Sequence, residues 1–282
     1  MSKSIVLTDS ACDLSPQTLK DFNIVQVPLK IIYKDREYEE KVEISSKEMF
    51  AKLKEEVPTT SLPSNETVAK AISKIIEQGY TDILVVNIST ALSGTLNSIR
   101  LVAEDFQDKI NFHYFDTKTL GYPEGVIVTE VARCVKEGLS VEEIKQKYPS
   151  IMARTKGFIN VDTLEFLIKG GRLSKAAGAI GTLLNLKPIV TYNEQGELYT
   201  YSKPRGRKQA NKQLKEVLKE DLAKGPCRVW ILSGDADELA QSFYDEIMDL
   251  ENIESIHLEE IGASMGIHTG PNTLGLVYLS LE

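Results

Sequence analysis

Short apolar runs alternate with amphipathic stretches along most of the chain, which is the pattern of strands that alternate with helices. The run Ile83-Leu84-Val85-Val86-Asn87-Ile88 is almost continuously apolar, as is typical of a parallel strand covered on both faces. Further strands are expected at residues 5–9, 24–33, 110–115, 155–161, 189–192, 197–201, 228–232, 253–261 and 274–281. The alternation predicts an α/β fold.

Capping residues indicate where several of the helices begin. Ser15 precedes Pro16, so a serine N-cap is followed by proline at the first helical position. Ser45 with Glu48 has the spacing of a capping box, and the same spacing recurs at residues 140 and 143. Helices are expected from residue 15 and over residues 45–56, 64–79, 95–105, 123–137, 141–152, 176–184, 209–223 and 235–250.

The pattern is less regular in the second half of the chain, and we predict a domain boundary within residues 150–160. The length of 282 residues allows two domains of ordinary size. We therefore expect two α/β domains, residues 1–155 and residues 156–282. In the second, Asn193-Glu194-Gln195-Gly196 between two expected strands indicates a hairpin turn.

Composition narrows the class of protein. The chain is 42% hydrophobic and 26% charged, as in an ordinary globular protein. Its formal charge of −8 argues against nucleic acid as a partner, because phosphate binding needs a dense basic face. We expect no secretory signal and no membrane insertion, since no apolar run approaches about 18 residues. Cys12, Cys134 and Cys227 are odd in number and far apart, which favours a reducing, cytoplasmic setting.

Hydroxyl side chains gather in two segments near expected helix starts. Thr59-Thr60-Ser61 precedes one helix, and Ser93-Gly94-Thr95 opens another. A helix start offers backbone N–H groups and a positive dipole end, which favour an anionic or carbonyl oxygen, and Gly94 allows a close approach. Serine and threonine also serve as plain helix caps. Both readings of these residues, a ligand site and a pair of caps, stay open at this point.

A third segment of interest, residues 262–271, is rich in glycine and holds His268. We expect it to form a loop. The imidazole of His268 is a candidate ligand-binding group, and a donor within a turn is the alternative.

Motifs of common catalytic classes are absent from the sequence. No GxSxG elbow surrounds Ser93, and neither a GxxxxGK[ST] phosphate loop nor a GxGxxG motif occurs. The three histidines have no metal-ligand spacing. Asp9, Asp13 and Asp116 follow or end strands, where they could act as acids or hold Mg²⁺, or simply cap turns. Lys169 and Arg172 flank two glycines, as an anion clamp or as a charged turn.

Two other classes of function therefore remain as alternatives. One is a small hydrolase or phosphotransferase that uses Asp9, Asp116 or Ser93. The other is an interaction module that uses the basic turn at residues 203–208, although such a turn is often only a solvated loop.

Six ordered motifs carry a resemblance to a known family. They are Thr8-Asp9-Ser10 with Asp13-Leu14, Thr60-Ser61-Leu62-Pro63-Ser64, Leu92-Ser93-Gly94-Thr95, Lys169-Gly170-Gly171-Arg172-Leu173-Ser174, Leu186-Lys187-Pro188-Ile189, and His268-Thr269-Gly270-Pro271 with Leu274-Gly275. Each is weak alone, but six in order over the whole length are specific. On these motifs the chain resembles the DegV family, the fatty-acid-binding subunits of a bacterial fatty acid kinase system.

The resemblance implies two α/β domains with a long-chain fatty acid buried between and within them. It implies that Thr60 and Ser93 hold the carboxylate, with Ser61, Gly94 and Thr95 beside them and His268 nearby. The bound fatty acid is then the only ligand, with no further cofactor and no metal. The C-terminal domain would form most of the acyl-chain pocket, for which the candidate lining residues are Leu164, Phe166, Leu167, Ile180, Leu183 and Leu184.

The resemblance further implies that the chain is not itself an enzyme. A partner kinase would phosphorylate the bound acid to an acyl-phosphate, which an acyltransferase would use for phospholipid synthesis. Arg205, after the hairpin, falls at the position implicated in docking partners. Two segments depart from the family pattern: Asn272 stands where glycine is frequent, and residues 117–124 replace a stretch rich in serine or glycine. We expect the second departure to affect which acyl chain fits.

Overall fold

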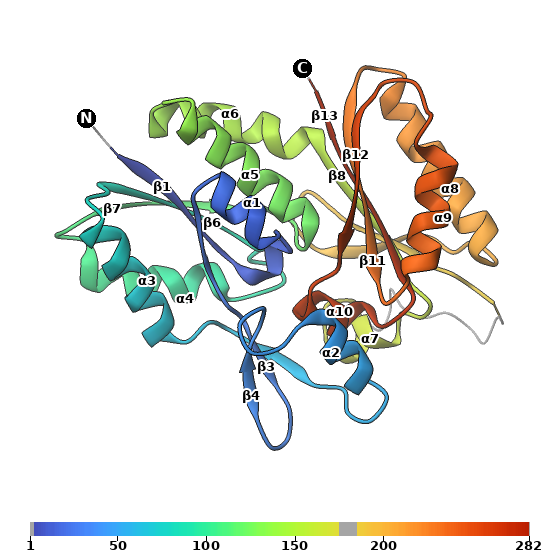
Figure 1. Cartoon of the computed structure of the whole chain (residues 1–282), viewed down its shortest axis with the longest axis horizontal. Coiled ribbons are helices and arrows are strands. Elements are labelled where there is room, and N and C mark those ends of the chain that lie inside the picture. The colour runs from blue at the N-terminus through green and yellow to red at the C-terminus, as the bar shows by residue number, and fades with distance from the viewer. Residues whose placement is uncertain (1–2, 175–184, 282) are drawn as a thin grey trace. The chain divides into compact units, whose positions relative to one another are not determined.

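The computed structural model describes residues 3–174 and 185–281, and Figure 1 shows their course. They form two compact units, one of residues 1–44 and 58–153, the other of residues 45–57 and 154–282. Residues 45–57 were expected to belong to the N-terminal domain. The structure groups them with the second unit because helix α2 (Ser46–Lys52) packs on α10 (Ala263–Thr269).

A four-stranded parallel sheet forms the centre of the first unit, in the order β2-β1-β6-β7. Its strands are β1 (Ser4–Asp9), β2 (Ile24–Val27), β6 (Asp82–Asn87) and β7 (Asn111–Asp116). Every residue of β6 is buried, which confirms the prediction from its apolar run. The predicted α/β class is confirmed as well.

Helices cover both faces of this sheet, and each face has its own apolar cluster. Side chains such as Val6, Leu84 and Ile127 pack on one face, while Ile5, Leu7 and others pack on the opposite face. The first cluster involves α5 (Tyr122–Lys136) and α6 (Val141–Arg154), and the second involves α3 (Asn65–Glu77) and α4 (Thr95–Ala103). The shorter α1 (Pro16–Asp21) begins at the Ser15 cap as predicted.

A small antiparallel sheet, in the order β4-β3-β5, also belongs to the first unit. It contains β3 (Lys30–Ile32), β4 (Glu37–Glu39) and β5 (Thr59–Ser61). The single strand expected over residues 24–33 was wrong: the chain leaves the parallel sheet at Pro28, which has no N–H to donate, and enters the small sheet as β3. Residues 59–61 were expected only to precede a helix, but they form a strand that pairs with β3, so that Thr60 lies opposite Ile31.

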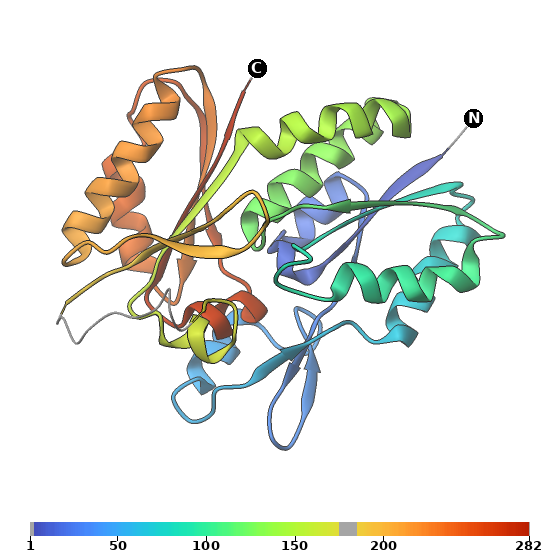
Figure 2. The same ribbon diagram turned by 180° about the vertical axis from the view of Figure 1, so that it is seen from behind.

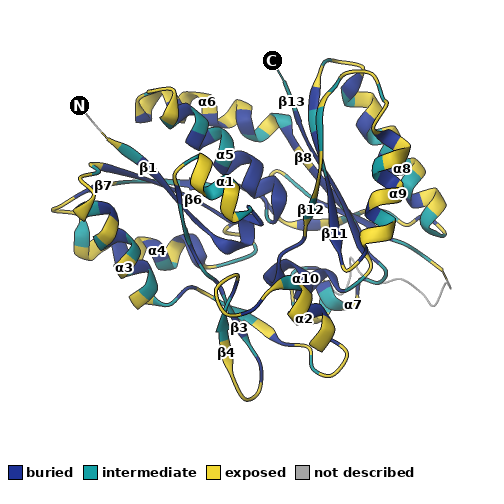
Figure 3. Ribbon diagram, in the orientation of Figure 1, coloured by how far each residue is buried: buried dark blue, intermediate teal, exposed yellow. Residues whose placement is uncertain are grey.

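The second unit contains a six-stranded sheet in the order β10-β9-β8-β13-β11-β12. Its strands are β8 (Thr155–Asn160), β9 (Ile189–Tyr192), β10 (Leu198–Ser202), β11 (Cys227–Gly234), β12 (Ile253–Glu260) and β13 (Thr273–Ser280). Helices α8 (Arg207–Leu222) and α9 (Asp237–Ile247) cover one face, and the central strands are buried (Figure 3). The predicted β9–β10 hairpin is confirmed and is seen from behind in Figure 2.

The segment around His268 is a helix, which corrects the loop expected there. All seven residues of α10 are buried, and α10 packs on α2 and on α7 (Glu165–Lys169). A Cβ at Gly266 would come within 2.6 Å of Met49 and Phe50, so only glycine allows this approach of α2 to α10. The helix predicted at residues 176–184 lies outside the described residues.

Candidate functional site

The two hydroxyl-bearing segments lie side by side in the first unit. Strand β5 carries Thr60 and Ser61 and leads to Leu62, while the segment after β6 carries Ser93 and Gly94. A Cβ built on Gly94 would contact Leu62 Cδ1 at 3.8 Å. Thr60, Ser61 and Ser93 are each partly exposed. Two segments about 30 residues apart in sequence thus present hydroxyl groups on neighbouring pieces of backbone.

The capping alternative fails for the first of these segments. Helix α3 is capped by Ser64, whose Oγ accepts a hydrogen bond from the Thr67 amide at 3.0 Å. Thr60 and Ser61 stand before that cap, in a strand, and do not serve it. These two side chains are therefore not the caps of α3.

The second segment differs from an ordinary capped helix start. The N-cap of α4 is Gly94, with no side-chain cap. Ser93 Oγ lies 2.8 Å from Thr95 Oγ1 and accepts a weak hydrogen bond from the Thr95 amide at 3.3 Å. Thr95 itself is fully buried. Ser93 is thus the outer member of a hydroxyl pair, and Thr95 fixes it from beneath.

Asp116, a candidate acid from the sequence, holds this loop in place. Its carboxylate accepts hydrogen bonds from Thr90 Oγ1 at 2.5 Å and from the Thr90 amide at 3.3 Å, and it pairs with Lys118 Nζ at 2.9 Å. Burial alone would raise its pKa, but these bonds outweigh burial and lower the pKa below its ordinary value. The carboxylate stays ionised and orders the start of the Ser93 loop.

The other two candidate aspartates are also engaged locally. Asp9 is fully buried and caps the short turn at Ser10–Cys12 by accepting from the Ala11 amide at 2.9 Å. Asp13 ends the same turn in the left-handed region, at φ 55°. Neither carboxylate is exposed to a ligand in solution.

His268 has a tightly shaped surrounding in the second unit. A Cβ on Gly170 would lie 2.2 Å from His268 Nδ1, so the ring packs directly on the Gly170 backbone. Burial first, and the charge of Arg172 second, lower the pKa of His268 to about 4. The imidazole is therefore neutral near pH 7, where it offers one N–H donor and one acceptor.

The two glycines in Lys169-Gly170-Gly171-Arg172 are required for different reasons. Gly170 makes room for the His268 ring, while Gly171 has φ +74° and nothing within 4 Å of its Cβ position. Lys169 pairs with Glu165, and Arg172 donates to the Gly170 carbonyl at 2.6 Å. The segment is a shaped support for His268, a role that no local sequence signal identified.

Arg205 and Arg207, two residues apart, differ in their surroundings. Arg205 is exposed after β10. The Arg207 guanidinium is half-buried and bonds to Asp162, to the side chain and carbonyl of Asn160, and to the Asn272 carbonyl. Asn272, where the family pattern has glycine, adopts φ 56° and joins this network.

The candidate pocket residues are only partly within the described chain. Leu164 and Leu167 are buried, and Phe166 packs on Gly270, where a Cβ would lie 2.5 Å from Phe166 Cδ2. Ile180, Leu183 and Leu184 lie outside the described residues. The lining role of all six stays a prediction.

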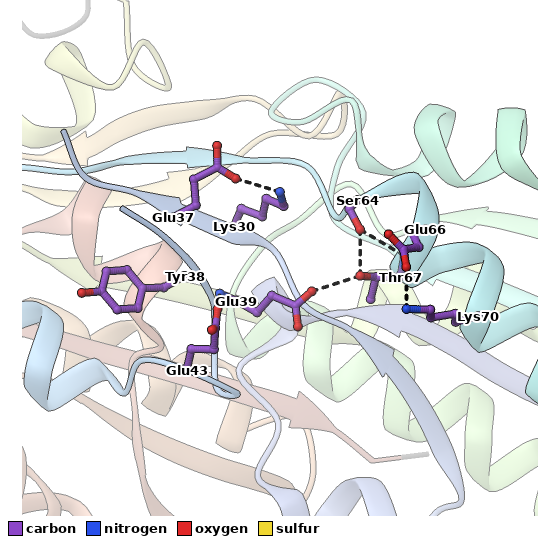
Figure 4. A pocket seen from close by; sticks show the side chains of 9 residues that line it. All are labelled: Lys30, Glu37, Tyr38, Glu39, Glu43, Ser64, Glu66, Thr67 and Lys70. Carbon is purple, nitrogen blue, oxygen red and sulfur yellow. Dashed lines mark hydrogen bonds and ion pairs between the residues drawn. The ribbon is translucent and has the colours of Figure 1, made fainter. Parts of the chain in front are cut away.

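A polar cavity of about 380 Å³ lies elsewhere in the first unit, between the β3–β4 hairpin and the start of α3 (Figure 4). Two ion pairs cross its wall, Lys30 with Glu37 and Lys70 with Glu66. Its charged lining does not suit an acyl chain. Among residues 3–174 and 185–281, no group of three or more His, Cys, Asp or Glu side chains could hold a metal ion. No helix within the described ranges is long and apolar enough to cross a membrane.

Comparison with known proteins gives one consistent result. A family model described as "uncharacterised protein, DegV family" matches residues 3–281. A DegV domain-containing protein of Clostridium perfringens is 44% identical over 98% of this chain and 98% of its own. The fatty-acid-binding DegV family protein of Thermus thermophilus superimposes with a TM-score of 0.91 at 29% identity, covering 99% of this chain and 100% of the other. A stearic-acid-binding protein of Eubacterium ventriosum gives a TM-score of 0.85 at 28% identity, over 99% and 98% of the two chains.

Proposed function

Because this chain belongs to the DegV family, we propose that it binds a long-chain fatty acid and holds the carboxylate with the hydroxyl groups of Thr60 and Ser93. The observation that carries the proposal is the adjacency of the two hydroxyl segments, with Gly94 against Leu62. Ser61, Gly94 and Thr95 complete the site as neighbours in the same two segments. The fatty acids bound by relatives of known structure support the same ligand class.

The chemistry of the site suits a carboxylate without a fixed positive charge. A buried carboxylate must be hydrogen-bonded, since its desolvation is otherwise costly. Hydroxyl groups supply donors, and the positive end of the α4 dipole adds a partial charge. We assign His268 to the same head group on the family resemblance, supported by its neutral imidazole. The acyl chain contributes about 0.8 kcal/mol for each buried CH₂.

In the same proposal the chain delivers its ligand and does not transform it. A fatty acid kinase phosphorylates the bound acid to an acyl-phosphate, and an acyltransferase takes it for phospholipid synthesis. Donors that carry no fixed charge tolerate this change of head group. Arg205 is the proposed docking residue, which its exposure supports. The cytoplasm is the proposed compartment, since Cys12, Cys134 and Cys227 are free and buried.

Native mass spectrometry tests the proposal directly. Protein purified from a bacterial host, or incubated with oleate, should carry one C14–C18 fatty acid. Thr60→Val and Ser93→Ala should each weaken binding by about tenfold to a hundredfold, because a hydrogen bond to a charged group contributes about 1.5–3 kcal/mol. Thr59→Val is the matched control, since Thr59 is the exposed neighbour in the same strand. Absence of any acyl ligand before and after incubation would overturn the proposal.

A further inference from the structure

The turn that ends β1 is a buried polar structure without an assigned purpose. Thr8, Asp9 and Ser10 are all completely buried, and they lead into a turn of three residues. None of these three residues is among those proposed to bind the carboxylate. Their bonds lead instead to the two segments that carry the hydroxyl groups.

Asp9 reaches the segment that carries Ser93. Asp9 Oδ2 accepts a hydrogen bond from Asn87 Nδ2 at 2.7 Å and a longer one from the Ile88 amide at 3.3 Å. Asn87 is the last residue of β6, and Ile88 begins the segment that continues to Ser93. The Asp9 carboxylate therefore fixes the point at which this segment leaves the sheet.

Ser10 reaches the small sheet that carries Thr60. Ser10 Oγ donates to Glu40 Oε2 at 2.5 Å and accepts from the Leu29 amide at 2.9 Å. Leu29 immediately precedes β3, and Glu40 immediately follows β4. One buried hydroxyl thus joins both strands at the base of the sheet in which β3 pairs with β5.

The chemical identity of Asp9 is more than a turn requires. A serine or threonine would cap the Ala11 amide equally well and would avoid burying a charge. Only a side chain with two acceptor oxygens bonds to Ala11 with one and to Asn87 and Ile88 with the other. Burying the carboxylate has a free-energy cost, since burial raises the pKa of Asp9 to about 6 despite these bonds.

We infer that Asp9 and Ser10 are positioning residues for the carboxylate site: Asp9 sets the Ser93 segment through Asn87 and Ile88, and Ser10 sets the Thr60 strand through Glu40 and Leu29. Adjacent residues of one turn thereby hold the two donors at a fixed separation. The inference rests on the proposed function and adds how the two hydroxyl groups are kept in register.

Variants within the same turn provide the test. Asp9→Asn and Ser10→Ala should weaken oleate binding by about 2-fold to 30-fold, the range for residues that act through others. Thr8→Val is the matched control, because Thr8 is equally buried and its hydroxyl meets no hydrogen-bond partner in the described chain. It should bind as the wild type does. Urea unfolding of each variant separates a loss of affinity from a loss of stability.

A pH profile distinguishes positioning from general destabilisation. When Asp9 is protonated it resembles asparagine, so the affinity ratio of wild type to Asp9→Asn should fall toward one as pH drops below about 6. Titration of the oleate carboxylate affects both proteins and cancels in the ratio. The other titratable groups whose charges act on this cluster are Glu40, Glu124, Cys12, Asp13 and Lys41.

Two results would overturn the inference: wild-type affinity in Asp9→Asn at pH 7.5, or an equal loss in Thr8→Val, Asp9→Asn and Ser10→Ala. Should Asp9→Asn not fold, Asn87→Ala removes the same link from the opposite side, and wild-type affinity in that variant would be equally decisive. Failure of the wild type itself to bind oleate would instead reject the proposed function.

Discussion

Gly170→Ala is the substitution that tests the surroundings of His268 most sharply. Gly170 has φ −71° and ψ −10°, which any residue adopts, so the backbone itself does not resist alanine. The new methyl group, however, would lie 2.2 Å from His268 Nδ1, 2.9 Å from Cε1 and 3.1 Å from the Phe166 carbonyl oxygen. At this distance the ring must move. Because α10 is buried along its whole length, the movement disturbs packed neighbours.

The expected loss of stability in Gly170→Ala follows from the overlap of the new methyl group with the His268 ring. Overpacking of a buried site costs about 1–3 kcal/mol. Gly171→Ala is a control of similar size and different cause: it forces a side chain into φ +74°, at about 1–2 kcal/mol, but its Cβ meets nothing within 4 Å. The two neighbouring variants should lose comparable stability, and only Gly170→Ala should displace His268.

Three measurements complete this experiment. Thermal unfolding should show a loss in both variants, while oleate affinity should fall further in Gly170→Ala than in Gly171→Ala. NMR titration of the imidazole should find the His268 pKa near 4 in the wild type and in Gly171→Ala, and nearer 6.5 in Gly170→Ala, where the ring is less completely buried. Equal affinities in the two variants, or an unchanged His268 pKa in Gly170→Ala, would refute the reasoning.

Two further predictions concern pH and docking. The pKa of His268 is lowered by burial from 6.5 to about 4, so the unfolded chain binds this proton more readily, and the stability of the fold should fall by about 3 kcal/mol as pH drops through that window. Urea unfolding at several pH values should show this dependence in the wild type and lose it in His268→Gln; parallel curves would contradict it. Under the proposed docking role, Arg205→Glu should reduce phosphorylation of bound oleate by a fatty acid kinase without changing oleate affinity. The exposed neighbour variant Lys208→Glu should change neither phosphorylation nor affinity. Arg207 is unsuitable for charge reversal, since its guanidinium is bonded to Asp162 and Asn160.

The elements that the sequence predicted well are those whose signals are local. The apolar run of β6, the Ser15 and Ser45 caps and the turn at Asn193 each specify their structure within a few residues. Strand β5 and helix α10 were missed because their structure depends on distant partners. β5 is three residues long and exists through its pairing with β3, and α10 contains a glycine that weakens a helix in isolation.

The candidate site shows the same division. The residue types at Thr60 and Ser93 were visible in the sequence, but their proximity is a property of the fold, in which Leu62 lies beside Gly94. The support beneath them was not visible either. Ser10 and Glu40 are 30 residues apart, and Asp9 and Asn87 are 78 apart. No local pattern connects side chains at such separations, so the sequence presented Asp9 only as a candidate acid, a Mg²⁺ ligand or a turn cap.

The contrast between the two helix starts explains why one of them suits a ligand. In α3 the Ser64 hydroxyl already satisfies the Thr67 amide, so that helix start is closed by its own side chain. In α4 the N-cap is Gly94, which has no side chain, and the Thr95 amide makes only a long hydrogen bond of 3.3 Å to Ser93 Oγ. The first-turn N–H groups and the positive dipole end of α4 therefore favour an anion near Ser93. Thr60 lies in β5 and takes no part in the α3 cap. In the proposed site, a carboxylate would accept hydrogen bonds from a strand and from a helix start, both of which are bonded to one buried turn.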